Sequence, residues 1–468
     1  MNKILYLPME IASRELDARL LLTVAALAQG FEVVIGQKWL IERNIRRMPP
    51  GIYLSKTMTR RDAKSIALAR SQGYFTAAID EELPGLVTRS DELRWISKEA
   101  VDATDLIFVS GDHNTRSFIG RFPEAREKVR MALNPRWDLL RSTLRQIFDD
   151  EVQAIRKTYG SFILINSNLG FINSEKGSPE ELFKDQVRLG KLDANNAEHA
   201  SYVKAICDME TANKAVIIEI VAALRARHPD LAIVLRPHPS ERIATWTDAL
   251  KGHSNVHVVR EGSAAPWIIA AAVLIHTNCT TGTEAIALDR PAICVLPTDS
   301  PVSARYLANR VNPTARSTVE ALELTERALT GQNLYSPEMI GAFKHAMSFE
   351  DDQLGAQSIV EDLIERASQR HKLVGGWLGN STWRPGRKYV WHLPDKNVRG
   401  ELFPVLDRSM VERRLVKIAH ALGIHLAPNV EYCGSKVLLI GNQRMGRLVR
   451  LRRAFAGKSI DFRDGTLR

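Results

Sequence analysis

The chain has 468 residues, of which 45% are hydrophobic and 25% are charged. These proportions exclude a disordered or fibrous chain, and the length is enough for two hydrophobic cores with residues left over. The formal net charge of +10 indicates an anionic partner, such as the phosphate of a nucleotide.

Short apolar runs alternate with helical stretches at the start of the chain. The predicted strands are residues 3–7, 32–35, 51–54, 74–80 and 106–110, and the predicted helices are residues 14–29, 61–72 and 91–100. This alternation of strands and helices is typical of a parallel sheet that is covered by helices on both faces. We therefore expect a Rossmann-like domain over residues 1–150.

A second series of the same kind begins near residue 162. Its predicted strands are residues 162–166, 232–236, 256–259, 273–276 and 292–296, and its predicted helices are residues 212–228, 267–271 and a stretch from about 283. The charged helix predicted at 139–157 marks the boundary, so the second Rossmann-like domain spans residues 151–370. The expected fold is α/β, with two Rossmann-like domains and a cleft between them.

The last hundred residues differ from the rest of the chain in composition and in their predicted elements. Residues 371–393 are rich in aromatic residues, glycine and proline, and only a helix at 409–422 and a strand at 436–440 are predicted beyond them. Residues 371–468 are therefore predicted to form a small irregular extension with a basic tail. Arg444–Arg453 (RMGRLVRLRR) is either a solvated tail or a segment that binds peripherally to an anionic inner-membrane surface.

The remaining composition points to a cytoplasmic protein. The four cysteines form no CxxC pair, which argues against a zinc site or a disulfide framework. Pro8 interrupts the first apolar run before it reaches the length of a signal peptide. No window approaches the roughly 20 apolar residues of a membrane span, and no nucleic-acid motif is present.

A first candidate site follows the predicted strand at 232–236, in the sequence Arg-Pro-His-Pro-Ser-Glu (residues 236–241). Ligands of open α/β sheets bind at the carboxyl ends of strands. The two prolines fix the backbone and aim His238, while Arg236 supplies a planar cation that suits a phosphate. We predict that Arg236, His238 and Ser240 bind the donor. The alternative is a solvated proline-rich loop.

A second candidate site joins the strand at 273–276 to a helix. Such a turn presents backbone N–H groups and a positive helix end to a phosphate, and its hydroxyl groups add donors. The predicted nucleotide-binding residues are Asn278, Thr280, Thr281, Gly282, Thr283 and Glu284. Among them, Glu284 is expected to accept hydrogen bonds from ribose. An ordinary helix start with an acidic first turn is the alternative.

Together, these two motifs resemble the C-terminal domain of GT-B glycosyltransferases, most closely those that use CMP-activated acidic sugars such as Kdo and sialic acid. The resemblance implies that an HP motif and a Ser/Thr-rich turn hold a CMP group. The CDP-glycerol glycerophosphotransferases have a similar Arg-Pro-His-Pro loop, which again indicates cytidine. A nucleotide-sugar co-substrate is thus implied, with no further cofactor and, as is usual for GT-B enzymes, no metal.

A wider resemblance covers most of residues 1–320. The sequences PMEIASRE (residues 8–15), GQK (36–38), DEE (80–82) and NPRWD (134–138) resemble bacterial surface carbohydrate biosynthesis proteins. That family name implies polysaccharide assembly without fixing the reaction. The resemblance does not extend beyond about residue 370.

Carboxylates in the first domain are the candidate catalytic groups. Asp80 and Glu81 follow a predicted strand, and three consecutive carboxylates repel one another, which tends to raise the pKa of at least one. We expect Glu81 or its neighbour Asp80 to act as general base toward an acceptor hydroxyl, and Glu15 is a further catalytic candidate. A solvated acidic loop is the alternative, and Mg²⁺ binding is a third reading of the triplet.

Five residues are predicted to line the acceptor side of the cleft: Glu10, Ser13, Arg14, Arg136 and Asn166. Glu10, Ser13 and Arg14 follow the first strand, where GT-B enzymes place acceptor groups, although a solvated first helical turn explains Arg14 equally well. Arg136 is expected to meet a phosphate and Asn166 a sugar hydroxyl, with a turn and a strand-end cap as their alternatives.

The favoured function is that of a glycosyltransferase of bacterial surface-polysaccharide assembly. It would move a sugar, such as a Kdo-like acid, from a cytidine nucleotide to a glycan or lipid-linked acceptor. One alternative is an enzyme like UDP-GlcNAc 2-epimerase, and another is a non-catalytic GT-B-fold subunit of a capsule-assembly complex. The step from site to reaction rests on analogy between folds.

Overall fold

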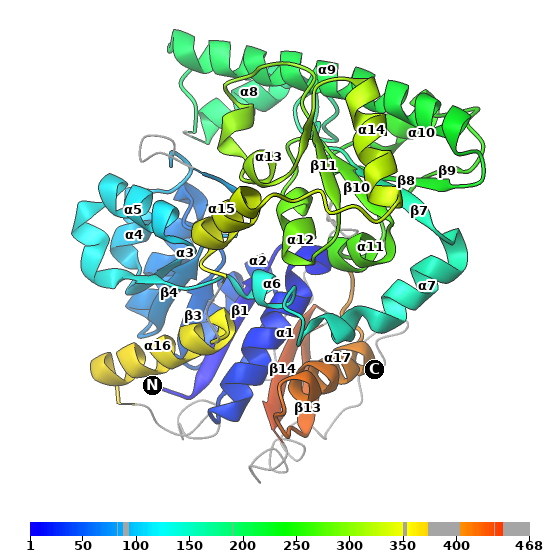
Figure 1. Cartoon of the computed structure of the whole chain (residues 1–468). Coiled ribbons are helices and arrows are strands. Elements are labelled where there is room, and N and C mark those ends of the chain that lie inside the picture. Colours follow the sequence, from blue (N-terminus) through cyan, green and yellow to red (C-terminus); the bar gives the residue numbers. More distant parts are fainter. Residues whose placement is uncertain are drawn as a thin grey trace, which may run out of the picture.

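The structure, a computed structural model, describes residues 1–81, 83–87, 93–189, 191–349, 353–372, 403–434 and 436–442. Within these ranges the strands form two sheets, one of eight strands and one of six. Figure 1 shows the sheets stacked end to end, each with helices on both faces, and the long helix α9 (Ala197–Arg227) across the top of the second domain.

The first sheet has the order β13-β14-β2-β1-β3-β4-β5-β6. Its parallel part consists of β1 (Ile4–Met9), β2 (Glu32–Gln37), β3 (Ile52–Ser55), β4 (Phe75–Ile79), β5 (Leu106–Val109) and β6 (Val129–Met131). These strands are apolar on both sides because helices cover both faces. One face packs on α1 (Ala12–Ala28). The other packs on α2 (Lys38–Asn44), α3 (Arg60–Ser71), α4 (Lys98–Ala103) and α5 (Asp112–Arg121).

The second sheet is parallel throughout and has the order β12-β11-β10-β7-β8-β9. Its strands are β7 (Phe162–Asn166), β8 (Ala232–Arg236), β9 (Val256–Val258), β10 (Val273–His276), β11 (Ala292–Val295) and β12 (Thr314–Ala315). One face packs on α9, α10 (Ile243–Ala249) and α14 (Thr318–Leu329). The other packs on α11 (Ala264–Ala270) and α12 (Thr281–Ala287).

The remaining helices connect or flank these layers. They are α6 (Pro135–Asp138), α7 (Asp149–Tyr159), α8 (Pro179–Arg188), α13 (Ala308–Val311), α15 (Pro337–Met347), α16 (Gly355–Arg370) and α17 (Arg408–Ala421). The start of α8 shows why the sequence folds this way locally. Ser178 accepts a hydrogen bond from the backbone N–H of Glu181 at 3.3 Å, and the Glu181 carboxylate accepts one from Ser178 N at 2.8 Å.

The C-terminal region differs from the irregular extension that the sequence predicted. Strands β13 (Pro428–Gly434) and β14 (Val437–Asn442) form an antiparallel pair, and β14 pairs antiparallel with β2 of the first sheet. The apolar side chains of β14 are buried there, and the pairing covers an edge of β2 that would otherwise be open. Figure 1 shows this pair and α17 beside α1. Arg444–Arg453 lies outside the described residues.

The chain crosses between the two sheets through α6 and α7, and returns through α15 and α16 (Figure 1). Asp138, at the end of α6, accepts hydrogen bonds from the backbone N–H groups of Gly355 and Ala356 at 3.1 and 2.8 Å. One cluster of buried hydrophobic residues contains side chains of both sheets. The two domains therefore share a packed junction as well as two connections.

Candidate functional site

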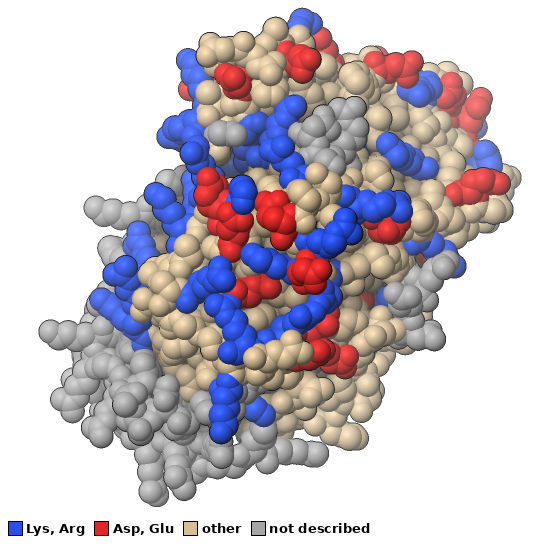
Figure 2. Space-filling model, turned by 90° about the vertical axis from the view of Figure 1, so that its left-hand side faces the viewer, with Lys and Arg blue, Asp and Glu red and all other residues tan. Residues whose placement is uncertain are grey.

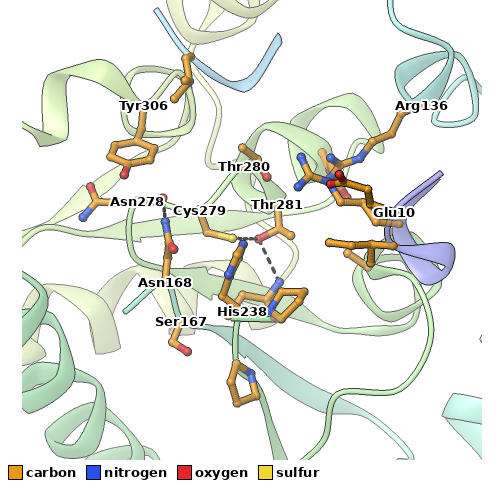
Figure 3. A pocket seen from close by; sticks show the side chains of 18 of the residues that line it. Glu10, Arg136, Ser167, Asn168, His238, Asn278, Cys279, Thr280, Thr281 and Tyr306 are labelled. Atoms are coloured by element: carbon orange, nitrogen blue, oxygen red, sulfur yellow. Dashed lines mark hydrogen bonds and ion pairs between the residues drawn. The ribbon is translucent and has the colours of Figure 1, made fainter. Parts of the chain in front are cut away.

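A cavity of about 1220 Å³ lies between the two domains. Residues that follow β1, β3 and β4 line it on one side, and residues that follow β7, β8 and β10 line it on the other. The carboxyl ends of both sheets therefore face the same space, which is where ligands of such sheets bind. Figure 3 shows a part of this cavity, with Glu10 and Arg136 opposite Asn278 and Tyr306.

His238 lies half-buried on the wall of the cavity, in the loop after β8. Its Nδ1 accepts a hydrogen bond from the backbone N–H of Ser240 at 3.3 Å and lies 2.7 Å from the Ser240 hydroxyl oxygen. Because the backbone N–H is only a donor, Nδ1 carries no proton and Nε2 does. His238 therefore presents an N–H donor. Ser240 is not part of the lining and instead fixes the tautomer of His238.

Arg236 also borders the cavity, but its guanidinium is engaged elsewhere. It donates to the backbone carbonyls of Glu261, Gly262 and Ser263 at 2.8, 2.9 and 3.2 Å, and it stacks over the Trp267 ring at 4.9 Å. Burial lowers the pKa of Arg236 to about 10, and the nearby Glu284 carboxylate opposes that shift. Arg236 is thus a charged group that shapes the 261–263 loop, a different placement from the phosphate clamp that we predicted.

The predicted threonine turn follows β10, and only part of it faces the cavity. Asn278, Thr280, Thr281 and Glu284 line the cavity, whereas Gly282 and Thr283 do not. A Cβ atom on Gly282 would lie 2.2 Å from Nε2 of His276, a buried histidine beneath the turn. Glycine is therefore needed at this position for packing against His276, which the sequence alone did not indicate.

Two asparagines hold the threonine turn in place, one at the end of β7 and one in the loop after it. Asn166 donates its Nδ2 to Thr281 Oγ1 at 3.0 Å. Asn168 donates its Nδ2 to the carbonyl of Asn278 at 2.8 Å (Figure 3). They can do so because β7 and β10 are neighbours in the sheet. Asn166, which we expected on the acceptor side, therefore lies with the threonine turn on the second-domain side of the cavity.

An ion pair joins the two sides of the cavity. Arg136, in α6, pairs with the carboxylate of Glu284, and the Glu284 side chain is only 4% exposed. Glu284 is the residue that we predicted to accept hydrogen bonds from ribose. A ribose at this position must share Glu284 with Arg136 or displace the guanidinium.

Glu10 is a carboxylate of the first domain that faces the cavity, and its side chain is 37% exposed. The ammonium groups of Lys38 and Lys56 lie 3.3 and 3.1 Å from its oxygens. Burial works to raise the pKa of Glu10, but these two lysines outweigh it and lower the pKa to about 2. Glu10 is therefore ionised across the physiological pH range.

Two of the predicted catalytic carboxylates lie behind the cavity wall. Glu15 accepts hydrogen bonds from the backbone N–H groups of Glu10 and Ile11 at 3.0 and 3.3 Å. It also pairs with Lys56 at 2.7 Å. Glu81 pairs with Arg19 at 2.9 Å and accepts from Asn134 Nδ2 at 3.2 Å. Neither side chain is part of the lining.

Asp80 does line the cavity, together with Ser13 and Arg14. Its two oxygens accept hydrogen bonds from Leu83 N at 3.1 Å and from Trp95 Nε1 at 3.2 Å. Arg14 donates to the backbone carbonyl of Glu81 at 3.4 Å. Glu82, the third carboxylate of the predicted triplet, lies outside the described residues.

Glu241 is a residue whose role the sequence did not reveal, although it ends the Arg-Pro-His-Pro-Ser-Glu motif. Its side chain is fully buried. The donors to its carboxylate are Ser167 Oγ (2.9 Å), Leu169 N (3.1 Å), Asn173 Nδ2 (3.3 Å), His238 N (2.9 Å) and Trp246 Nε1 (2.8 Å). Glu241 thereby ties the loop after β7 to the loop that carries His238.

Within the described ranges, no group of three or more His, Cys, Asp or Glu side chains is placed to hold a metal ion. Among the helices in those same ranges, none combines the length and the apolar composition needed to cross a membrane.

Comparison with known proteins shows the fold and no family. The sequence matches no protein-family model and no curated protein. Among solved structures, MnaA of S. aureus with UDP has a TM-score of 0.50 at 12% identity, over 79% of this chain and 97% of that one.

Two other solved structures have lower TM-scores. The wall teichoic acid polymerase TagF with CDPG scores 0.48 at 12% identity, over 78% of this chain and 89% of that one. The UDP-GlcNAc 2-epimerase of Neisseria meningitidis bound to UDP-GlcNAc scores 0.47 at 14% identity, over 78% of this chain and all of that one. The predicted fold class is confirmed: the chain has two Rossmann-like domains in the GT-B arrangement, with a cleft between them.

Proposed function

We propose that this chain is a glycosyltransferase of surface-polysaccharide assembly that takes a sugar from a cytidine nucleotide. The observation that carries the proposal is the cavity between the domains. His238 and the threonine turn border it on one side, and the ionised Glu10 borders it on the other. Such an arrangement brings an activated donor and an acceptor hydroxyl together in one enclosed space.

The second domain supplies the donor half. The Nε2–H of His238 and the hydroxyl groups of Thr280 and Thr281 are the donors proposed for the nucleotide phosphate. Glu284 is the group proposed for ribose. Support for cytidine comes from the Arg-Pro-His-Pro loop, which resembles those of enzymes that use CMP-linked and CDP-linked donors.

The first domain supplies the acceptor half. A carboxylate with a pKa of about 2 is a weak base, and general bases work best with a pKa near the working pH. We therefore assign Glu10 the role of accepting a hydrogen bond from an acceptor hydroxyl and orienting it. The acceptor is a glycan or a lipid-linked glycan.

The transfer step forms a bond between the acceptor oxygen and the anomeric carbon of the sugar. The bond from that carbon to the phosphate oxygen breaks, and CMP leaves with the electron pair. The proton of the acceptor hydroxyl passes to a carboxylate, for which Asp80 is the predicted residue that lines the cavity. Donors around the phosphate stabilise the charge that develops on it.

A panel of nucleotides in a thermal-shift assay tests the proposal. At about 100 times its Kd, CMP stabilises the folded protein by about 2.7 kcal/mol, which raises the melting temperature. The increase is lost in His238→Ala and retained in His345→Ala, a control at an exposed histidine of α15. Stabilisation by UDP but not CMP would contradict the cytidine donor and favour an epimerase-like enzyme. A wild-type protein that no nucleotide stabilises would contradict the transferase altogether.

A further inference from the structure

The ion pair between Arg136 and Glu284 is buried, unlike most ion pairs of a protein surface. Figure 2 shows one face of the molecule, where Lys and Arg side chains lie beside Asp and Glu, and solvent-exposed pairs of that kind contribute little to stability. The side chains of Arg136 and Glu284 are only 17% and 4% exposed. Among the residues that the structure describes, Arg136 alone forms a hydrogen bond with the Glu284 carboxylate. A ligand hydroxyl that binds Glu284 must therefore compete with this guanidinium.

The backbone of Arg136 is fixed to the first domain, so its side chain is the part that can move. Asn134 Oδ1 accepts a hydrogen bond from Arg136 N at 2.9 Å. The backbone N–H of Asn134 donates to Ser110 Oγ at 2.9 Å, and its Nδ2 donates to the Glu81 carboxylate at 3.2 Å. Ser110 and Glu81 follow β5 and β4 of the first sheet. Arg136 can therefore change its partner by rotation about side-chain bonds, while α6 stays in place.

Arg236, a second arginine whose charge interacts with Glu284, is held in a different way. Its guanidinium donates to three backbone carbonyls and stacks on the Trp267 ring. For the Arg136 guanidinium, in contrast, Glu284 is the hydrogen-bond partner found within the described ranges. Arg136 is therefore the arginine that is released when Glu284 changes its partner.

Thr280 and Glu284 are neighbours along the cavity wall. The backbone N–H of Glu284 donates to the carbonyl of Thr280 at 3.1 Å, and side chains four residues apart on a helix have Cβ atoms about 5–6 Å apart. Both residues line the cavity. Figure 3 shows the Arg136 side chain extending from the other side toward Thr280 and Thr281. A phosphate bound at Thr280 is thus within reach of a guanidinium that leaves Glu284.

We propose that Arg136 binds the donor phosphate once the donor ribose has taken its place on Glu284. The positions of phosphate and ribose rest on the proposed function, whereas the choice of Arg136 rests on its contacts. The exchange replaces one charged hydrogen bond by another, because carboxylate and phosphate oxygens both accept from a guanidinium. A nucleoside breaks the ion pair without this replacement. Arg136 therefore favours nucleotides over nucleosides and ties the first domain to a bound donor.

Calorimetric titrations of wild type and Arg136→Gln with cytidine and with CMP test this role. The Kd of CMP rises at least about tenfold in the variant, because a hydrogen bond between charged groups is lost. The Kd of cytidine falls by a factor of about three, because its ribose no longer competes with a guanidinium for Glu284. Opposite changes for two ligands that differ by one phosphate cannot come from a general loss of structure.

Two further variants complete the test. Arg136→Lys keeps a positive charge but not the planar guanidinium, so the Kd of CMP rises less than in Arg136→Gln. If Arg136→Gln does not fold, which its melting temperature without ligand shows, Arg136→Lys serves for the same comparison. The matched control is Arg116→Gln in α5, which removes an arginine whose ion pair with Asp112 is exposed. Both Kd values are the same in this control as in wild type.

Two results would overturn the role given to Arg136. One is an unchanged Kd of CMP in Arg136→Gln. The other is a change of the same sign and size for cytidine and CMP, which would show that Arg136 only holds the two domains together.

The wild-type titrations separate this role from the proposed function. Wild type that binds UMP and not CMP would contradict the cytidine donor, and uridine and UMP then replace cytidine and CMP in the comparison. Wild type that binds none of these four compounds would contradict the proposed function and the role of Arg136 together. Binding of CMP with the same Kd in wild type and Arg136→Gln would contradict the role of Arg136 alone.

Discussion

Glu241 in the second domain and three carboxylates of the first domain are held in different ways. In the second domain, the donors to Glu241 are backbone and side-chain groups without charge, which come from two loops and from helix α10. In the first domain, Glu10, Glu15 and Glu81 are paired with lysine or arginine. The first arrangement fixes the shape of a loop, and the second sets the charge and the pKa of the groups around it. Substitutions in the second domain should therefore mainly lower the free energy of unfolding. Substitutions in the first domain should shift the pKa of neighbouring carboxylates.

The largest effect is expected at Glu241. Glu241→Ala leaves several buried donors without an acceptor, each of which costs about 1–3 kcal/mol. We expect a loss of at least about 4 kcal/mol in the free energy of unfolding, measured by urea denaturation. Glu241→Gln keeps one acceptor oxygen and loses less. An alanine variant as stable as wild type would contradict the role given to this carboxylate.

A smaller loss is expected at Gly282, also in the second domain. The new Cβ of Gly282→Ala meets the buried His276 ring, and overpacking of this kind costs about 1–3 kcal/mol. The control is Gly341→Ala in α15, where a Cβ meets no atom within 4 Å and the change favours the helix. Urea denaturation of both variants separates the crowding from the general effect of adding a methyl group. Equal stability of the two would show that the turn can move away from His276.

A change in pKa is the effect to measure at Lys56 in the first domain, because this lysine contacts Glu10. Lys56→Gln removes one of the two lysines that lower this pKa to about 2, so the pKa rises toward its ordinary value. Carboxyl NMR titration measures the shift. An unchanged pKa would show that Lys56 does not set the charge of Glu10.

The same pKa fixes how Glu10 affects stability. Because its folded pKa is lowered, its contribution is present above the unfolded pKa of about 4.3 and is lost as pH falls toward about 2. The side chain is 37% exposed, so solvent screening limits this contribution to at most about 1 kcal/mol. The part of the stability difference between wild type and Lys56→Gln that comes from Glu10 should therefore be present above that pH window and shrink as pH falls through it.

The sequence predicted the strands and the loops after β8 and β10 because these signals are local. The apolar runs before His238 and Asn278 and the turn residues after them lie within a few positions of each other. The placement of Glu81 depends on Arg19 and Asn134, which are 62 and 53 residues away in the chain. No local pattern shows that these partners would turn Glu81 away from the cavity.

The same limit applies to the first sheet and to the contact between Arg94 and His199. The apolar run of β14 predicted a strand, but its neighbour β2 lies about 400 residues earlier. Arg94 and His199 come from different domains, and nothing in either sequence neighbourhood relates them. Contacts between charged residues that are far apart in the chain could not be predicted from the sequence, because only the tertiary structure brings them together.

Hydrogen–deuterium exchange with and without CMP tests the central claim most directly, namely that a nucleotide binds to the loops after β8 and β10. We expect slower exchange with CMP at residues 236–241 and 277–284, and no change in α5, on the far side of the first sheet from α1. Unchanged exchange in both loops, or protection confined to other parts of the chain, would contradict it.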